Sequence, residues 1–120
     1  MARSLVIKVT AGKDDPERCN QAFTVAAAAA ASGVGVSLWL TGESAWFALP
    51  GRAEDFTLPE AAPLQDLLAG ILAAGTVTLC TQCAARRDIT PDAVIDGIRI
   101  AGAPTFVAEI TADGVQALVY

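Results

Sequence analysis

The fold is decided by residues 4–40, which read SLVIKVTAGKDDPERCNQAFTVAAAAAASGVGVSLWL. Residues 4–10 are a β-branched, apolar run with the length of a buried strand, and residues 34–40 are a second such run. Between them, Asp15 is placed to cap a helix that continues to about Ser32. A strand, a helix and a strand in this order make parallel sheets with right-handed crossovers, so the sequence predicts an α/β fold.

The helix between these strands is rich in alanine. Pro16 suits its first position, and Gly33 suits its end. Its apolar positions recur at helical spacing and predict one narrow stripe that faces the sheet: Cys19, Ala22, Phe23, Ala26, Ala27 and Ala30. Because most of these side chains are methyl groups, the helix can approach its neighbours closely.

The rest of the chain continues the alternation of strands and helices. Residues 41–63 are irregular, with a short helix through Phe47 and then scattered prolines. After them the sequence predicts a helix at 64–74, a strand at 76–80, one or two helical turns at 81–88, a helix at 90–97, a strand at 98–101, a helix at 104–111 and a strand at 115–120.

The composition of the chain excludes several classes of function. The chain has 120 residues, of which 53% are apolar and 18% charged, with a formal net charge of -5. We expect one domain, 1–120, in a soluble cytoplasmic protein, with no transmembrane or targeting segment. The acidic balance argues against binding nucleic acid or a membrane surface. The absence of histidine excludes Ser-His-Asp catalysis, Cys-His proteolysis and His-ligated zinc within one chain.

Cys80 and Cys83 are the strongest candidates for a functional site in the sequence. Cys80 ends a predicted parallel strand, where open α/β sheets place their sites, and a helical turn begins after it. Backbone N–H groups at such a turn lower a cysteine pKa and favour the nucleophilic thiolate. Arg86 and Arg87 follow one turn after Cys83 and are candidates for electrostatic support. Both cysteines are also candidates for core packing, because free cysteine is often buried.

Other chemistry is less well supported by the sequence. A zinc site would need two more ligands, so we expect no metal and no cofactor. The segment Ala11-Gly12-Lys13 lacks the flanking glycines of a phosphate loop. Trp39, Trp46 and Phe47 are candidates for a pocket or a partner surface, although core packing is the better interpretation.

Several strings nevertheless resemble the DsrE/DsrF-like family, which includes TusD and YchN-like sulfur-relay proteins. The resemblance spans essentially the whole chain. It is carried by the first strand with the segment Gly12–Arg18, the alanine-rich helix, the end of the second strand at Trp39–Gly42, and above all residues 79–90, LCTQCAARRDIT. One departure is Asp88, which stands where many members have glycine.

This resemblance implies a single three-layer domain, with a mostly parallel five-stranded sheet between helices, and assembly into trimers or hexamers. In sulfur-carrying members, the cysteine at the position of Cys80 accepts a persulfide. Cys83 is then an auxiliary thiol. The pocket candidates are four residues from the strings that carry the resemblance: Gly12, Lys13, Thr41 and Gly42.

The leading hypothesis is therefore a persulfide carrier, similar to a sulfurtransferase, that works with sulfur donor and acceptor proteins. An alternative is a non-catalytic oligomeric binding module, with Cys80 only lining a cleft between subunits. A third hypothesis is a dithiol redox switch formed by Cys80 and Cys83.

Overall fold

Five parallel strands form the centre of the protein in a computed structural model that describes residues 3–120. They are β1 (Ser4–Val9), β2 (Gly35–Leu40), β3 (Thr76–Cys80), β4 (Ile98–Ala101) and β5 (Val115–Val119). Their order in the sheet is β4-β3-β2-β1-β5, and every neighbouring pair is parallel. The predicted α/β fold is confirmed, and the sheet is wholly rather than mostly parallel.

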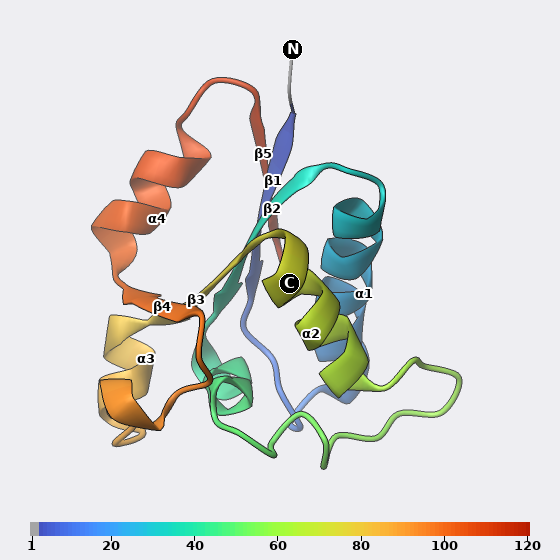
Figure 1. The fold of residues 1–120 in the computed structure, drawn as a ribbon. Coiled ribbons are helices and arrows are strands. Elements are labelled where there is room, and N and C mark those ends of the chain that lie inside the picture. The colour runs from blue at the N-terminus through green and yellow to red at the C-terminus, as the bar shows by residue number, and fades with distance from the viewer. Residues whose placement is uncertain (1–2) are drawn as a thin grey trace.

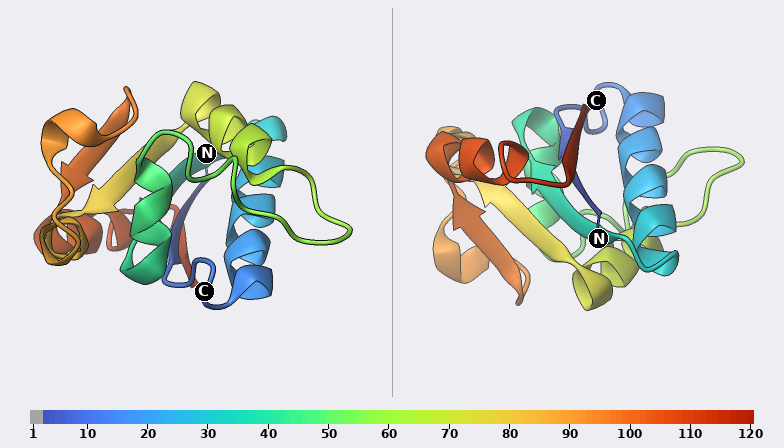
Figure 2. Two further views of the ribbon diagram at one scale, coloured as in Figure 1. Left: turned by 90° about the horizontal axis from the view of Figure 1, so that it is seen from below. Right: turned by 90° about the horizontal axis from the view of Figure 1, so that it is seen from above.

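Helices cover both faces of this sheet and make three layers (Figures 1 and 2). Helices α1 (Pro16–Ala31) and α2 (Leu64–Ala74) pack together on one face, and α4 (Ala103–Ile110) lies on the other. The short helix α3 (Thr81–Arg86) follows β3 directly. The 3-10 segments η1 (Gly42–Ala48) and η2 (Pro91–Ala93) complete the chain.

The hydrophobic core lies between the sheet and the layer of α1 and α2. Alternate strand residues point into it, among them Ile7, Leu38 and Leu79, each with 0% of its surface exposed. Burying each such side chain contributes about 1.5–3 kcal/mol. The predicted stripe of α1 faces this core, with Cys19, Ala22, Phe23 and Ala26 buried and Ala27 and Ala30 half-buried.

The opposite face of the sheet, which α4 covers, is mixed: Val6 and Trp39 are buried there beside several polar side chains. Lys8, Trp39, Thr78 and Arg99 form one row across four strands. Glu109 of α4 reaches this row: it pairs with Arg99 and accepts hydrogen bonds from Trp39 Nε1 at 3.0 Å and, beside the row, from Ser37 Oγ at 2.7 Å. Burial raises the pKa of Glu109, but these donors outweigh burial and lower it. Helix α4 has no buried residue, and both these polar contacts and the packing of its Phe106 ring on Trp39 hold it to this face.

The prediction of a helix at 90–97 was wrong, because only the single turn η2 forms there. The backbone leaves the helical region at Val94, which is extended, and the N–H of Ile95 donates to the carbonyl of Ala48 at 2.9 Å. Val94 and Ile95 pack against the core in this conformation. Burial of these two β-branched side chains therefore replaces the helical hydrogen bonds that the Thr90-Pro91 start signal predicted.

Candidate functional site

Cys80 is the last residue of β3 and the residue immediately before α3. It lies opposite Ala101 of β4 in the sheet register. Because side chains alternate along a strand, Cys80 lies on the same face of the sheet as Thr78, the face that α4 covers. Its side chain is half-buried, whereas Leu79 beside it is fully enclosed. Cys80 is thus exposed in part, at the carboxyl end of an inner strand.

The surroundings of Cys80 favour its ionised form. Burial raises the pKa of Cys80, but hydrogen bonds from the backbone and thiol of Cys83 and from the backbone of Gln82 outweigh it, and the Lys8 ammonium adds to their effect. The pKa of Cys80 is lowered as a result. The sequence reasoning did not single out Lys8; its signal was a single charge within the apolar strand at 4–10.

Cys83 lies one helical turn after Cys80 and is buried. Its Sγ accepts a hydrogen bond from the backbone N–H of Gly42 at 3.3 Å, and its thiol donates to Cys80. Burial raises the pKa of Cys83; the Gly42 N–H and Arg87 oppose this, whereas the bond to Cys80 and its charge reinforce it. The pair therefore divides into a more acidic, accessible Cys80 and a less acidic, buried Cys83.

The two arginines after Cys83 are placed differently. Arg87 pairs with Glu43 of η1, with Nη2 2.7 Å and Nε 3.2 Å from the same carboxylate oxygen. It also donates from Nη1 to the carbonyl of Cys83 at 3.1 Å. Arg86 is exposed. Arg87 thus connects α3 with η1 next to Cys83, while the cation that acts on Cys80 is Lys8.

Asp88 forms the turn that ends α3. Its φ of 53° lies in the left-handed region, where glycine is most easily accommodated. The N–H groups of Asp88 and Ile89 donate to the carbonyls of Ala85 and Ala84, the pattern of a Schellman motif. Aspartate tolerates this conformation better than most residues do, so the turn forms although the sequence has no glycine here.

Three of the four pocket candidates join the ends of β1 and β2. A Cβ on Gly12 would lie 2.6 Å from the carbonyl oxygen of Glu43, and one on Gly42 would lie 2.5 Å from that of Thr10. Thr41 is buried and donates from Oγ1 to the carbonyl of Val9 at 2.8 Å. These residues bring η1 close to the backbone that follows β1, and from there Gly42 reaches Cys83.

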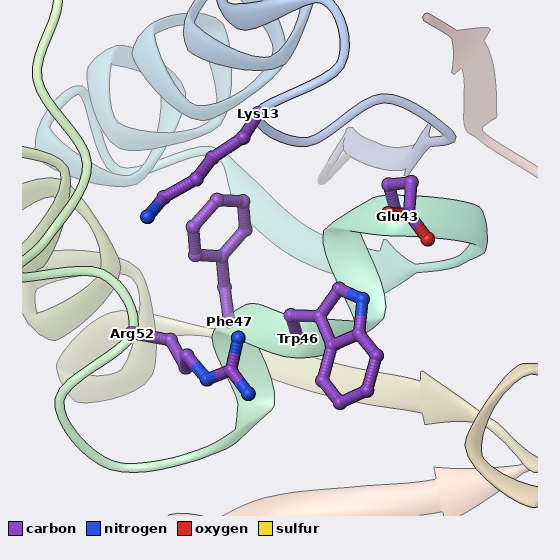
Figure 3. A pocket seen from close by; sticks show the side chains of 5 residues that line it. All are labelled: Lys13, Glu43, Trp46, Phe47 and Arg52. Carbon is purple, nitrogen blue, oxygen red and sulfur yellow. The ribbon is translucent and has the colours of Figure 1, made fainter. Parts of the chain in front are cut away.

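The fourth candidate, Lys13, belongs to a separate hollow. Figure 3 shows it with the other lining residues, which are Glu43, Trp46, Phe47 and Arg52. The hollow has a volume of about 160 Å³. Phe47 is almost fully buried, as core packing predicts, yet it also lines the hollow with the half-buried Trp46. Trp39 lies on the other face of the sheet, where its ring contacts Phe106 edge to face at 5.3 Å.

Cys19 is a core residue. It is fully buried on α1, and burial, together with the charges of Asp14 and Asp15, raises its pKa to about 12. Within residues 3–120 the three cysteines are free, and no three His, Cys, Asp or Glu side chains are grouped as metal ligands would be. Over the same residues, none of the helices has both the length and the apolar character that a membrane crossing requires.

Comparison with known proteins identifies the fold and the family. The structure is similar to that of the YchN protein from E. coli, with a TM-score of 0.78, 22% sequence identity and 100% of both chains covered. It is also similar to a conserved protein of unknown function from Bacteroides thetaiotaomicron, with a TM-score of 0.63 and 19% identity over 98% of this chain and 94% of that one.

A third solved structure, a protein of unknown function from Methanobacterium thermoautotrophicum, has a TM-score of 0.68 at 6% identity, with 100% of both chains covered. No curated protein matches the sequence. The family model described as DsrE/DsrF-like matches residues 3–119. The resemblance seen in the sequence is thereby confirmed, and the chain belongs to the DsrE/DsrF-like family.

Proposed function

We propose that the protein carries sulfane sulfur as a persulfide on Cys80. The observation that supports this most directly is a half-buried thiol with a lowered pKa at the carboxyl end of an inner parallel strand. A carrier thiol needs a thiolate to accept sulfur and enough exposure to meet a donor and an acceptor. Cys80 combines both properties, whereas Cys19 is buried and only weakly acidic.

The proposed transfer is a thiol exchange with no net oxidation. The Cys80 thiolate attacks the outer sulfur of a donor persulfide, R–S–SH. A new S–S bond forms on Cys80, the S–S bond of the donor breaks, and the donor leaves as R–S⁻. In the second step an acceptor thiolate attacks the outer sulfur on Cys80, and Cys80 leaves as the thiolate. The hydrogen bonds that stabilise the resting thiolate also stabilise this leaving group.

The pH dependence of alkylation tests the state of Cys80. Because its pKa is lowered, thiolate is present at pH values where an ordinary cysteine is still protonated. The rate of alkylation of Cys80 by iodoacetamide can be measured by peptide mass mapping. We expect this rate to rise with pH and to reach half its maximum at a lower pH in the native protein than in the urea-unfolded chain. Cys83 should react later, and Cys19 only after unfolding. A native midpoint for Cys80 at or above the unfolded one would contradict the proposed activation.

The hydrogen bond between the two thiols favours a second candidate, a dithiol switch. The Cys80 thiolate would attack a small disulfide such as oxidised glutathione, releasing one thiolate and leaving a mixed disulfide. Cys83, once deprotonated, would then attack the Cys80 sulfur and release the second thiolate. Cys83 is disfavoured for this step because its pKa is raised. The persulfide carrier is therefore the first choice.

We also propose that the chain forms a homo-oligomer through its last two elements. Over residues 3–120, the large apolar side chains that are exposed lie on α4 and β5: Val107, Leu118 and Val119. Strand β5 is an edge of the sheet, and Val119 is 65% exposed. An apolar edge strand is a surface that proteins usually cover or pair.

A single charge on this edge should disrupt the assembly. We expect light scattering to give a trimer or hexamer for the wild type and a monomer for Val119→Glu, because a carboxylate at this position would lose its hydration in a packed contact. Ala73→Glu, on the exposed side of α2, is the matched control and should assemble normally. A monomeric wild type at micromolar concentration would refute the proposal.

A further inference from the structure

The hollow lined by Lys13, Glu43, Trp46, Phe47 and Arg52 is built from three segments that follow β1 and β2. Lys13 comes from the turn before α1, Trp46 and Phe47 from η1, and Arg52 from the loop after it. Figure 3 shows Lys13 and Arg52 on two sides of the Phe47 ring, with Trp46 next to Arg52. A small apolar floor thus has a cation on each side, in an arrangement typical of sites for small organic anions.

Among residues 3–120, neither of these two cations forms an ion pair with a carboxylate. The ion pairs in this part of the chain form between Arg18 and Asp15, Arg87 and Glu43, and Arg99 and Glu109. Glu43, the one acidic residue in the lining, is held by Arg87. The chain carries a net charge of -5, so carboxylates are plentiful. Two unpaired cations that share one hollow form a local positive site on an acidic protein.

Arg52 also contacts Trp46. Its guanidinium carbon lies 4.7 Å from the centroid of the Trp46 ring, a cation–π contact that favours this position of the exposed side chain. Its N–H groups then remain available at the edge of the guanidinium. Arginine held in this way suits two parallel hydrogen bonds to one oxyanion. Lys13 supplies a compact charge from the other side.

We propose that this hollow binds a small phosphate monoester. The phosphate would lie between Lys13 and Arg52, and its organic group would contact Phe47 and the edge of Trp46. A phosphate monoester carries between about 1.5 and 2 negative charges at pH 7 and so matches two cations, whereas a carboxylate carries one. A volume of about 160 Å³ admits a small ester but is too small to enclose a nucleotide. The site relies on side-chain cations, unlike a phosphate loop of backbone N–H groups.

Titration with phenyl phosphate tests the site in the intact protein. Binding should be saturable by calorimetry, with a Kd of about 1 mM or lower, and should change the tryptophan fluorescence, because Trp46 lines the hollow. Arg52→Gln and Lys13→Gln should each weaken binding at least tenfold. Arg3→Gln removes the same charge before β1, at the opposite end of the sheet, and should leave the Kd within about twofold of the wild type.

Two further ligands define the class. Phenylacetate, with a single charge, and inorganic phosphate, without the apolar group, should both bind more weakly than phenyl phosphate. Absence of saturable binding up to about 10 mM, equal affinity for phenylacetate, or equal losses in Arg3→Gln and Arg52→Gln would each overturn the proposal. None of the five residues that line the hollow is a cysteine. The binding of phenyl phosphate is therefore independent of whether Cys80 accepts sulfur.

Discussion

Cys80→Ser is expected to abolish sulfur loading completely. Wild-type protein that is reduced, desalted and incubated with a small-molecule persulfide should gain about 32 mass units for one added sulfur atom, and a thiol reductant should remove them. Serine has no thiolate to attack the sulfane sulfur, so the variant should keep its original mass. The buried Cys19 cannot substitute, because its pKa of about 12 leaves almost no thiolate at neutral pH.

Cys83→Ser is the matched control for this experiment. Its hydroxyl can still donate a hydrogen bond to Cys80, and the backbone N–H groups of residues 82 and 83 remain, so loading should persist. Loading of Cys80→Ser would contradict the assignment of Cys80. A loss of about 2 mass units from the wild type with no gain would favour the dithiol switch. An unmodified wild type would favour the binding module.

Gly42→Ala is expected to be the most destabilising of the glycine substitutions considered. At a φ of 53° any other residue is strained, and a Cβ there would lie 2.5 Å from the carbonyl oxygen of Thr10. We expect the left-handed backbone to cost about 1–2 kcal/mol and the displacement of η1 from β1 a further 1–3 kcal/mol or so. The midpoint of urea unfolding should fall accordingly, with an unchanged m-value.

Gly51→Ala separates these two contributions. Gly51 also has a positive φ, of 85°, but a Cβ there would have no neighbour within 4 Å. Its substitution should therefore show only the backbone strain, about 1 kcal/mol. Equal destabilisation of the two variants would mean that the close approach of Gly42 to Thr10 does not contribute. Any movement of Gly42 would also weaken its hydrogen bond to Cys83.

The sequence predicted local elements well because their signals are local. The cap at Asp15, the apolar alternation of β1 and β2, and the leucines of α2 all determine structure within a few residues. The helix at 90–97 failed because a long-range contact to Ala48 replaced its local hydrogen bonds. The strand order of the sheet could be expected only from the family resemblance, since hydrophobic patterns do not specify which strands become neighbours.

The site was predictable in part for the same reason. The position of Cys80 at a strand end follows from residues 76–83, and the structure places it there. The influence of Lys8 arises from pairing between β1, β2 and β3, which no spacing along the chain reveals. Glycines at 12 and 42 could be noted from the sequence, but the backbone contacts that require them are visible only in three dimensions. Arg52, after a proline and a glycine, carried no pattern that marked it as part of a hollow.

Because Glu109 helps to attach α4, the helices on the two faces of the sheet are held by different interactions. Burial of apolar surface holds α1 and α2, and this contribution does not require an ionised carboxylate. By contrast, α4 is held in part by the Glu109 carboxylate, whose pKa is lowered. The stabilising effect of this carboxylate is complete above the ordinary glutamate range and declines as acid titrates the folded form. The molecule thus has one side held by apolar burial and one side whose helix is held in part by an ionised carboxylate, and Cys80 lies on the second side.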